Sequence, residues 1–446
     1  MKKLFNCFIF ILVGMFVFLL TACEEADAIK NYESRIIALE TALAEQEELL
    51  GDYEFRIQDL EDELGKTKNS IKSVQTRVGE IETTLNTVSS DVTNLKGTSD
   101  TSVQVYLADQ YYLVVNDNFQ LFYRSVIRAV DPYGYYIKVT GDKGHALNRY
   151  FEFKPDTVGT YQLKIEVCDS NGHVLGSDST KLVVVDSKKA NATEKTILCI
   201  GDSLTSNGVW VARGVSKYVS AGGKATTIGT ITTTSGGKTY KYEGRSGWQW
   251  SSYLSKYDSS TMSPFAPTGS NPSIRDYCTR NGFGEITDFY IMMTFNGLPG
   301  SYTEFTFDTP FIQQAKTLID LIHSEYPNAK ISLMNLPLTS TRAGLGAYYQ
   351  ISSTYSDNYG KAVTVLHYGD FLEKWCKMSS YKSFMRYVDI KAQFDSEYNM
   401  PYETKSVNNT NTSEKETVGN AMGMHPSTNG YNQIGDAVYR ALMSNW

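Results

Sequence analysis

A long seven-residue repeat of apolar positions runs through the first part of the chain. From Ile29 to Leu95, hydrophobic residues recur at alternating spacings of three and four, with charged and polar residues between them. Gln46 and Thr67 are the polar members of this seam. A strict repeat of this length predicts a left-handed coiled coil, not an amphipathic helix folded back on its own domain. β-Branched residues at the second apolar position of the later repeats favour a homotrimer.

The apolar period shortens to two after the repeat ends. Residues 102–186 alternate apolar and polar side chains and are rich in Tyr and Val, which predicts β-strands. Within this segment, Gly159 to Asp186 predicts two strands joined by an Asn171-Gly172 turn. Its length and turn spacing suit an immunoglobulin-like β-sandwich. The tyrosines of this domain could bind a glycan, but a role as a spacer that presents the next domain is favoured. The polar residues 187–195 are expected to form a linker.

Alternating strand and helix patterns fill residues 196–446. Thr196–Ile200 predicts a buried strand, Pro310–Tyr326 a helix, and Lys330–Leu336 the following strand. Such alternation predicts an α/β fold with a parallel sheet covered on both faces. The polar stretch Glu403–Thr417 is expected to be a mobile loop. An amphipathic helix is predicted near the C-terminus. Its apolar face contains Ile434, Ala437, Val438, Ala441 and Leu442.

The N-terminus carries a secretion signal. Met1-Lys2-Lys3 precedes an uncharged apolar run that ends in Leu20-Thr21-Ala22-Cys23. This ending resembles a bacterial lipobox, which implies a signal peptide over residues 1–22 and a lipid on Cys23, followed by a lipidated stalk over residues 23–97. The alternative is an uncleaved membrane anchor, because the run approaches a membrane-spanning length. Both interpretations predict attachment to the extracytoplasmic face of the cell membrane.

Charge and cysteine usage exclude several classes of function. The chain has 49 acidic and 42 basic side chains and a net charge of −7, so nothing points to nucleic acid. No disulfide framework or Cys-x-x-Cys metal site is evident, although a Cys278–Cys376 pair stays open. His145, His173, His323 and His367 have no companions at metal-ligand spacing, so neither a metal nor a cofactor is expected.

The candidate chemistry lies in two short motifs far apart in the chain. Gly201-Asp202-Ser203-Leu204-Thr205 directly follows the apolar run Thr196–Ile200, and His425-Pro426 lies near the C-terminus. A serine hydroxyl needs an adjacent base to become a nucleophile, and donors to stabilise the oxyanion that forms. Ligands of open α/β sheets bind beyond the carboxyl ends of the strands. Ser203 is therefore the candidate nucleophile and His425 the candidate base.

These residues resemble the SGNH (GDSL) hydrolases over residues 194–446. The resemblance implies a three-layer α/β/α fold and a serine esterase activity. It also implies an oxyanion hole made from the Ser203 N–H, a glycine N–H and an asparagine amide. Glu243-Gly244-Arg245-Ser246-Gly247-Trp248 resembles the glycine block, with Gly244 preferred over Gly247. Asn296 is the implied amide donor.

Two blocks depart from the family pattern. Thr294 and Gly297 replace the glycine and aspartate that flank the family's asparagine. The family's aspartate three residues before the histidine is replaced by Met422. That aspartate normally orients the imidazole and stabilises the imidazolium. Another group then holds the ring of His425, or a Ser–His dyad operates, or the site is inactive.

The expected function is therefore that of a cell-surface esterase on an oligomeric stalk. O-acetyl groups on a polysaccharide are the favoured substrate, because Trp248 and Trp250 adjoin the glycine block and aromatic rings stack on sugars. Both tryptophans equally fit a place in the core. The alternative function is a surface adhesin or glycan-binding lipoprotein on a catalytically decayed SGNH fold.

Overall fold

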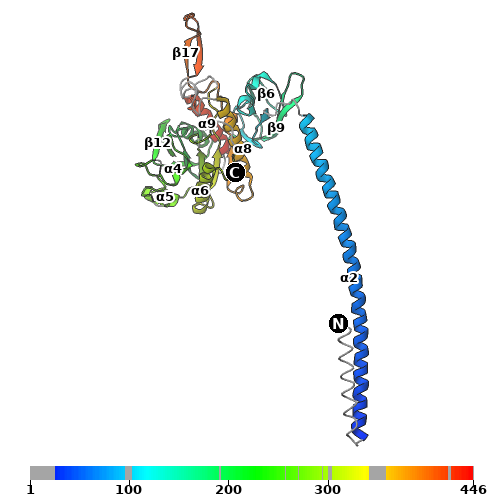
Figure 1. The fold of residues 1–446 in the computed structure, drawn as a ribbon. Coiled ribbons are helices and arrows are strands. Elements are labelled where there is room, and N and C mark those ends of the chain that lie inside the picture. Colours follow the sequence, from blue (N-terminus) through cyan, green and yellow to red (C-terminus); the bar gives the residue numbers. More distant parts are fainter. Residues whose placement is uncertain are drawn as a thin grey trace. The chain divides into compact units, whose positions relative to one another are not determined.

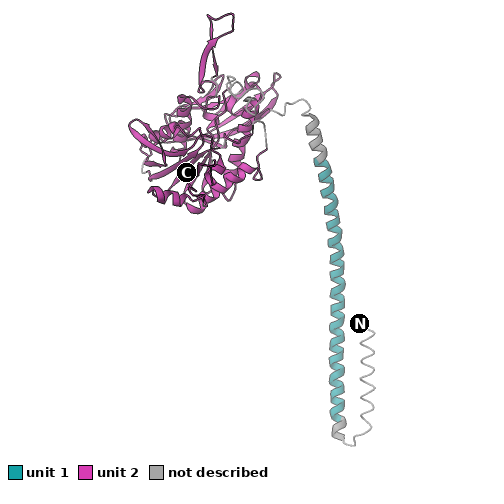
Figure 2. Cartoon of the chain, turned by 60° about the vertical axis from the view of Figure 1, so that its left-hand side comes forward, with its two compact units in different colours: residues 1–98 teal, residues 99–446 magenta. Residues whose placement is uncertain are grey.

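The computed structural model describes residues 26–95, 103–189, 192–256, 258–269, 271–293, 295–299, 304–340, 358–419, 423–444 and 446. The chain divides into two compact units, residues 1–98 and 99–446 (Figure 2). The expected signal peptide (residues 1–22), Cys23 and Met422 lie outside the described residues. Within the described part of the chain, no helix has the length and apolar character needed to span a membrane.

The described part of the first unit is one continuous helix, α2 (Ala26–Leu95, 70 residues), which covers the seven-residue repeat (Figure 1). Its seam side chains are exposed in the single chain, as at Ile57 (56 %), Leu60 (65 %) and Leu85 (66 %). In a coiled coil, such a seam is buried against the seam of another helix. The continuous helix agrees with the sequence pattern, and its assembly into a coiled coil stays a prediction.

Residues 103–189 form a β domain built from small sheets. The expected hairpin is present: β8 (Gly159–Cys168) pairs antiparallel with β9 (Val174–Val185). The four-stranded sheet has the order β2-β9-β8-β5, and β2 joins it parallel to β9. The immunoglobulin-like topology stays a prediction. The other strands are β1 (Gln104–Val105), β2 (Gln110–Val114), β3 (Phe119–Phe122), β4 (Ile127–Arg128), β5 (Tyr136–Gly141), β6 (His145–Ala146) and β7 (Tyr150–Phe153).

The α/β domain, residues 192–446, contains the sheet that carries the candidate site. Its strand order is β12-β13-β10-β14-β15-β16, with β11 also paired to β10. All pairings are parallel except that of the edge strand β12 with β13. The sheet is thus mixed, where the sequence led us to expect a parallel one. The strands are β10 (Lys195–Gly201), β11 (Ala225–Ile228), β12 (Ile231–Ser235), β13 (Lys238–Gly244), β14 (Asp288–Met292), β15 (Lys330–Met334) and β16 (Met385–Val388).

Among the helices, α3 packs against α9, α6 packs against α4 and α5, and α8 packs against the strand β16. Figure 1 shows α4, α5 and α6 close together. The expected helices are confirmed: Ile312, Ala315, Ile319 and Ile322 of α6 are each 0 % exposed, and Ile434, Ala437 and Val438 of α9 are each 1 % exposed. Cys168, Cys199, Cys278 and Cys376 are all free and buried. The helices are α3 (Val209–Ser220), α4 (Trp250–Leu254), α5 (Ile274–Asn281), α6 (Pro310–Glu325), α8 (Asn358–Lys377) and α9 (Thr428–Met443).

The polar stretch before the candidate histidine is not the irregular loop that its composition predicts. It forms an antiparallel hairpin of β17 (Tyr402–Ser406) and β18 (Lys415–Gly419), which projects from the domain in Figure 1. Polar side chains are compatible with both strands, because neither face of the hairpin is buried in a core. The expectation of an irregular loop was wrong because it equated low hydrophobicity with irregular structure.

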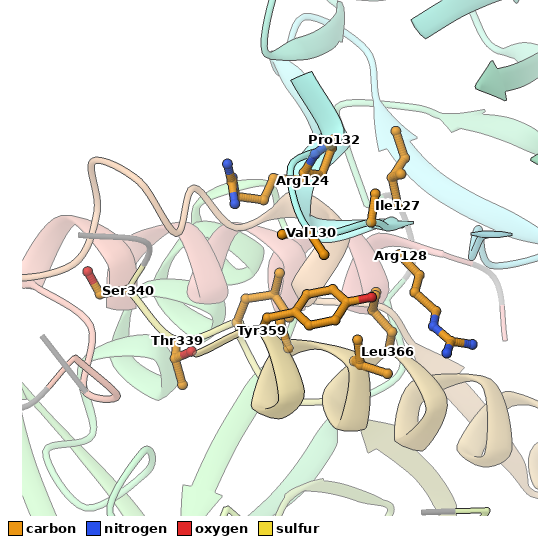
Figure 3. Close-up of a pocket in the computed structure, with 13 residues that line it drawn as sticks. Arg124, Ile127, Arg128, Val130, Pro132, Thr339, Ser340, Tyr359 and Leu366 are labelled. Carbon is orange, nitrogen blue, oxygen red and sulfur yellow. The ribbon is translucent and has the colours of Figure 1, made fainter. Parts of the chain in front are cut away.

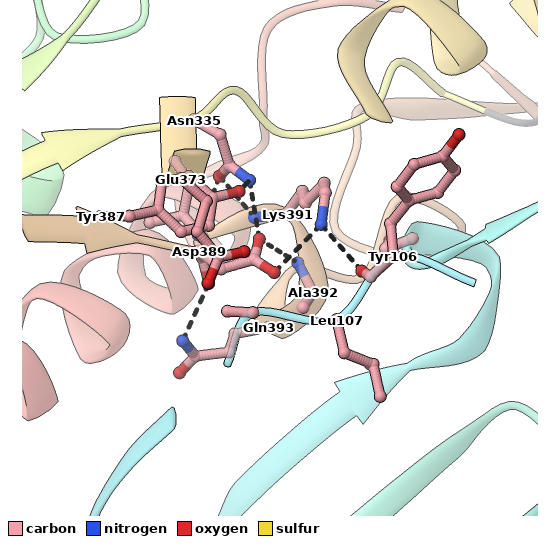
Figure 4. Close-up of polar contacts among 12 residues, drawn as sticks. Tyr106, Leu107, Asn335, Glu373, Tyr387, Asp389, Lys391, Ala392 and Gln393 are labelled. Carbon is pink, nitrogen blue, oxygen red and sulfur yellow. Dashed lines mark hydrogen bonds and ion pairs between the residues drawn. The ribbon is translucent and has the colours of Figure 1, made fainter. Parts of the chain in front are cut away.

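A buried polar cluster joins the β domain to the α/β domain just after β16 (Figure 4). Asp389 accepts hydrogen bonds from Tyr111 Oη (2.7 Å), Asn335 Nδ2 (2.7 Å) and Lys391 Nζ (3.0 Å). Lys391 Nζ also donates to the carbonyl oxygen of Tyr106 (3.3 Å). Burial, followed by the charge of Asp389, raises the pKa of Tyr111 well above its usual value, so its hydroxyl remains a donor. The side chains of Asp389 and Lys391 are 0 % and 2 % exposed, so each charge depends on the other.

We expect this cluster to make the two domains unfold together. Asp389→Ala leaves Lys391 buried without its carboxylate and should lower the free energy of unfolding by about 3–5 kcal/mol. Tyr111→Phe removes one hydrogen bond to a charged group and should cost about 2 kcal/mol. Urea denaturation measures both. The control is Lys374→Ala, because Lys374 pairs with Asp370 on the surface at 70 % exposure and such pairs contribute little. Equal effects of Asp389→Ala and the control would contradict the expectation.

Candidate active site

Ser203 lies in a tight turn between a buried strand and a helix. The strand β10 ends at Gly201, and α3 begins at Val209. The turn is closed by backbone hydrogen bonds from Thr205 N to Asp202 O (3.0 Å) and from Ser206 N to Ser203 O (3.3 Å). The Ser203 side chain is half-buried at the carboxyl edge of the sheet. The apolar run and the Gly-Asp-Ser motif thus place a hydroxyl where parallel sheets bind ligands.

Two glycines allow this turn to lie directly on the neighbouring strands. A Cβ added to Gly201 would come within 2.0 Å of Thr205 Oγ1 and 2.6 Å of Met292 O. A Cβ on Gly244 would lie 2.6 Å from the Thr205 carbonyl carbon and 2.8 Å from Ser206 N. Both positions therefore require glycine for close packing. Gly244 ends β13 opposite Gly201 and thus adjoins the nucleophile turn.

The Asn296 segment is tied to the same turn by the side chain of Asp202, which is 0 % exposed. Asp202 Oδ1 accepts a hydrogen bond from Leu204 N (2.9 Å), and Oδ2 accepts one from Phe295 N (3.0 Å). Asn296 Nδ2 donates to Trp248 O (3.1 Å). The structure thus brings the asparagine, the glycine block and the serine turn to one edge of the sheet.

The glycine block itself contains two candidates for the second oxyanion donor. Gly244 is the last residue of β13, and Gly247 lies in the turn that follows, with a φ of 81°. That turn is closed by a hydrogen bond from Trp248 N to Arg245 O (3.2 Å). Gly244 as donor stays a prediction, and Gly247 remains its alternative.

His425 reaches Ser203 from a distant part of the chain. Its Nε2 lies 2.9 Å from Ser203 Oγ, within hydrogen-bonding distance. The histidine stands shortly before α9, whose N-cap Ser427 accepts a hydrogen bond from Gly430 N (3.3 Å). Gly423 O, on the other side of His425, accepts from Ser340 N (2.6 Å). The candidate nucleophile and the candidate base are therefore in contact, which is the geometry that general-base activation of a serine requires.

Burial lowers the pKa of His425 below its usual value. No described carboxylate contributes to this shift, and none forms an ion pair with the ring. A neutral imidazole is the form that accepts a proton from serine, so burial favours the basic form at neutral pH. Within the described part of the chain, His425 therefore lies beside Ser203 without the acid of a Ser-His-Asp triad.

The two tryptophans lie in the core and not at the substrate surface. Trp250 is 0 % and Trp248 is 3 % exposed. Trp248 packs edge-on against Tyr253 with ring centroids 4.8 Å apart, and the Arg245 guanidinium carbon lies 5.0 Å from its ring centroid. Neither ring offers a free face to a sugar, so the expectation of substrate contacts at these residues is corrected in favour of the core.

A cavity of about 180 Å³ lies between the β domain and α8 (Figure 3). We call residues 423–427, which contain His425, the histidine segment. Arg124 lines it from the β domain, and Thr339, Ser340 and Tyr359 line it from the α/β domain. Ser340 connects this cavity to the histidine segment through its hydrogen bond to Gly423 O. Among the described residues, no group of His, Cys, Asp or Glu side chains is arranged to hold a metal ion.

Sequence reasoning missed the contacts that support the histidine segment. Ser427 N and Oγ both donate to Asn399 O, at 2.9 and 2.8 Å. Ser427 could have been found as an N-cap, because Ser before a helical apolar pattern is a known start signal. Its partner Asn399 could not, because no local pattern links it to residue 427.

This chain is similar to several solved structures, which include a possible lipase and a carbohydrate acetylesterase. A possible lipase from Chitinophaga pinensis is 15% identical, covering 56% of this chain and 97% of its own, at a TM-score of 0.32. A carbohydrate acetylesterase from Sinorhizobium meliloti is 14% identical, covering 55% and 97%, at 0.31. The periplasmic domain of a lipopolysaccharide acetyltransferase from Salmonella Paratyphi A is 13% identical, covering 57% and 85%, at 0.34. No protein-family model and no curated protein sequence matches this chain.

The ionisation of His425 should set the acidic limb of any Ser203-dependent reaction. Because the neutral ring is the active form and burial lowers its pKa, kcat/KM should rise with pH and reach half its plateau below pH 6.5. The measurement is kcat/KM for a small acetyl ester between about pH 4.5 and 8, with Ser203→Ala as the background control. A midpoint above 6.5 would contradict a neutral, buried base.

Proposed function

We propose that this protein is a serine esterase. The observation that carries the proposal is the 2.9 Å contact between Ser203 Oγ and His425 Nε2 at the carboxyl edge of the sheet. Ser203 Oγ attacks the ester carbonyl carbon while His425 takes the hydroxyl proton. His425 then returns the proton to the departing alcohol, leaving an acyl-serine. Water, activated by the same ring, releases the acid and restores the serine.

The oxyanion that forms at each step needs nearby donors. The Ser203 N–H, the Gly244 N–H and the Asn296 amide are the proposed donors. Asp202 supports this arrangement, because its two carboxylate oxygens hold Leu204 N of the serine turn and Phe295 N beside Asn296. Each such donor typically contributes about 10²–10³ to the rate.

An O-acetyl group on a polysaccharide is the proposed substrate, on the outer face of the cell membrane. The cavity between the β domain and α8 supports this choice, because it has polar lining residues and because one of them, Ser340, is hydrogen-bonded to Gly423 just before His425. The lipidated Cys23 proposed from the sequence would keep the enzyme at the surface.

An adhesin on a decayed esterase fold is the second candidate. It is favoured by the replacement of the family's aspartate by Met422 and by the lack of a described carboxylate at His425. The contact of His425 with Ser203 favours the esterase instead. Glycan binding without hydrolysis would support the adhesin.

The nucleophile and the base can each be tested by substitution. Ser203→Ala and His425→Ala should each lower kcat for a small acetyl ester by about 10⁴ or more, since the pair acts as a unit. Ser246→Ala is the control, because this exposed hydroxyl is close to the site and donates to Ser206 Oγ (3.2 Å). Met422→Asp should retain activity. It should raise the rate if the new carboxylate reaches the His425 ring as the family's aspartate does. Hydrolysis that survives Ser203→Ala would place the nucleophile elsewhere.

The exposed seam of α2 supports a homo-oligomeric stalk, with a trimer favoured. Ile57→Glu combined with Leu60→Glu places charges in the seam and should dissociate the oligomer. The matched control is Phe55→Glu, because Phe55 is 68 % exposed but lies off the seam. Sedimentation equilibrium of residues 24–446 measures the outcome. A monomeric wild type at micromolar concentration would refute the assembly.

A further inference from the structure

The segment Asp395–Asn399 lies directly against the start of α9 and the residues that follow His425. Asn399 O accepts hydrogen bonds from both the backbone N and the Oγ of Ser427 (2.9 and 2.8 Å). Gln433 Oε1 in α9 accepts from Asp395 N (2.9 Å) and from Asn399 Nδ2 (2.7 Å). We call Asp395–Asn399 the clamp segment. Four hydrogen bonds thus tie its two ends to the helix that His425 precedes.

The other side of the clamp segment is held by the β domain. Arg149, just before β7, donates from Nη2 to Asp395 Oδ1 (2.6 Å) and from Nε to Glu397 Oε2 (3.1 Å). Its guanidinium carbon lies 4.3 Å from the centroid of the Tyr398 ring. Tyr133 Oη donates to Glu397 Oε1 (2.5 Å). One arginine therefore contacts three of the five clamp residues, two through charge and one through stacking, which fixes its planar fork in one orientation.

The clamp segment is also organised from within by the carboxylate that Arg149 binds. Asp395 Oδ1 accepts hydrogen bonds from Glu397 N (3.0 Å) and Tyr398 N (3.1 Å), and Asn399 N donates to Asp395 O (3.0 Å). The Asp395 and Glu397 side chains are 11 % and 19 % exposed. Removing Arg149 would leave the largely buried Asp395 without an arginine partner, while Glu397 would keep only Arg124 Nε at 3.7 Å and the Tyr133 hydroxyl. Loss of the shared cation should therefore loosen the segment around Asp395.

We propose that Arg149 of the β domain is a positioning residue for His425, acting through the clamp segment. The inference rests on the proposed esterase function. In a triad, a carboxylate at the far ring nitrogen fixes the imidazole. Here no described carboxylate contacts the ring of His425. The position of the ring therefore depends on the backbone around it, which the hydrogen bonds between Ser427 and Asn399 O hold in place. The β domain thereby becomes part of the catalytic unit. A displacement of about 1 Å in the position of the ring is enough to lower kcat by about 10²-fold.

The kinetic test compares Arg149→Met, Arg149→Lys and Glu397→Gln with the wild type on a small acetyl ester. Arg149→Met should lower kcat by about 10–100-fold while KM stays within about twofold, because the acyl-binding residues are untouched. Arg149→Lys keeps one charge but loses the fork and should recover part of the rate. Glu397→Gln keeps a neutral acceptor and should have the smallest effect.

The matched control is Lys377→Met, which removes another ion pair between the β domain and the α/β domain. Lys377 Nζ donates to Asp109 Oδ2 (2.8 Å), and its removal leaves the contacts of Arg149 with Asp395 and Glu397 in place. It should leave kcat unchanged. Equal losses for Lys377→Met and Arg149→Met, or a kcat for Arg149→Met within twofold of the wild type, would overturn the proposal.

A readout independent of turnover separates this proposal from the proposed function. Histidine side chains labelled with ¹³C, with the His425 signal assigned by His425→Gln, report the titration of the ring by NMR. Arg149→Met should move the pKa of His425 upward, toward the value of a solvated ring, because the buried position of the ring is lost. An unchanged titration overturns the positioning role. A wild type without ester hydrolysis refutes the proposed function, and the titration still decides the role of Arg149.

Discussion

The register of β10 against its neighbours is the constraint on which the candidate site depends. Gly201 lies opposite Gly244 on one side and opposite Met292 on the other. Parallel strands in this register end at the same level, so the segments that follow them meet at one edge. The absence of side chains at both glycines then lets the Ser203 turn rest on the adjacent backbone. A slip of one residue would direct the side chains of β10 to the opposite face of the sheet and separate Ser203 from Asn296.

The β domain is joined to the α/β domain by polar contacts as well as by apolar packing. Asp389 and Lys391 carry opposite charges in a buried position, and Tyr111 completes their hydrogen bonding. Buried ion pairs of this kind contribute little net stability but penalise any arrangement in which one partner is missing. We infer that their role is to specify one docking of the β domain. Arg149 depends on that docking to reach the clamp segment.

In the candidate site, the Ser203 hydroxyl contacts the His425 ring, and no described carboxylate contacts that ring. Burial lowers the pKa of His425, whereas a triad carboxylate would raise it. If only the surrounding backbone positions the His425 ring, no acid stabilises the imidazolium form. The step in which the ring carries the proton should then be slower. Hydrolysis of a reactive acetyl ester demands less of the base than hydrolysis of an amide, so the proposed substrate class is consistent with this arrangement.

The sequence by itself determined the local elements and the chemistry of the candidate residues. The apolar period and the Asn171-Gly172 turn predicted α6 and α9, the β8–β9 hairpin and the helix α2, because each depends on contacts between residues close in the chain. The Gly-Asp-Ser motif predicted the place of Ser203 for the same reason. The hairpin β17–β18 was misread, because its pairing, and not its composition, makes it regular.

Only the tertiary structure decided which distant residues meet. It placed His425 at Ser203, buried Trp248 and Trp250 in the core, and set Arg149 against Asp395. No local period encodes these contacts, because each arises from the packing of elements far apart in the chain. Whether an aromatic ring faces a substrate or the core, and what supports a histidine without its acid, depends on that packing alone.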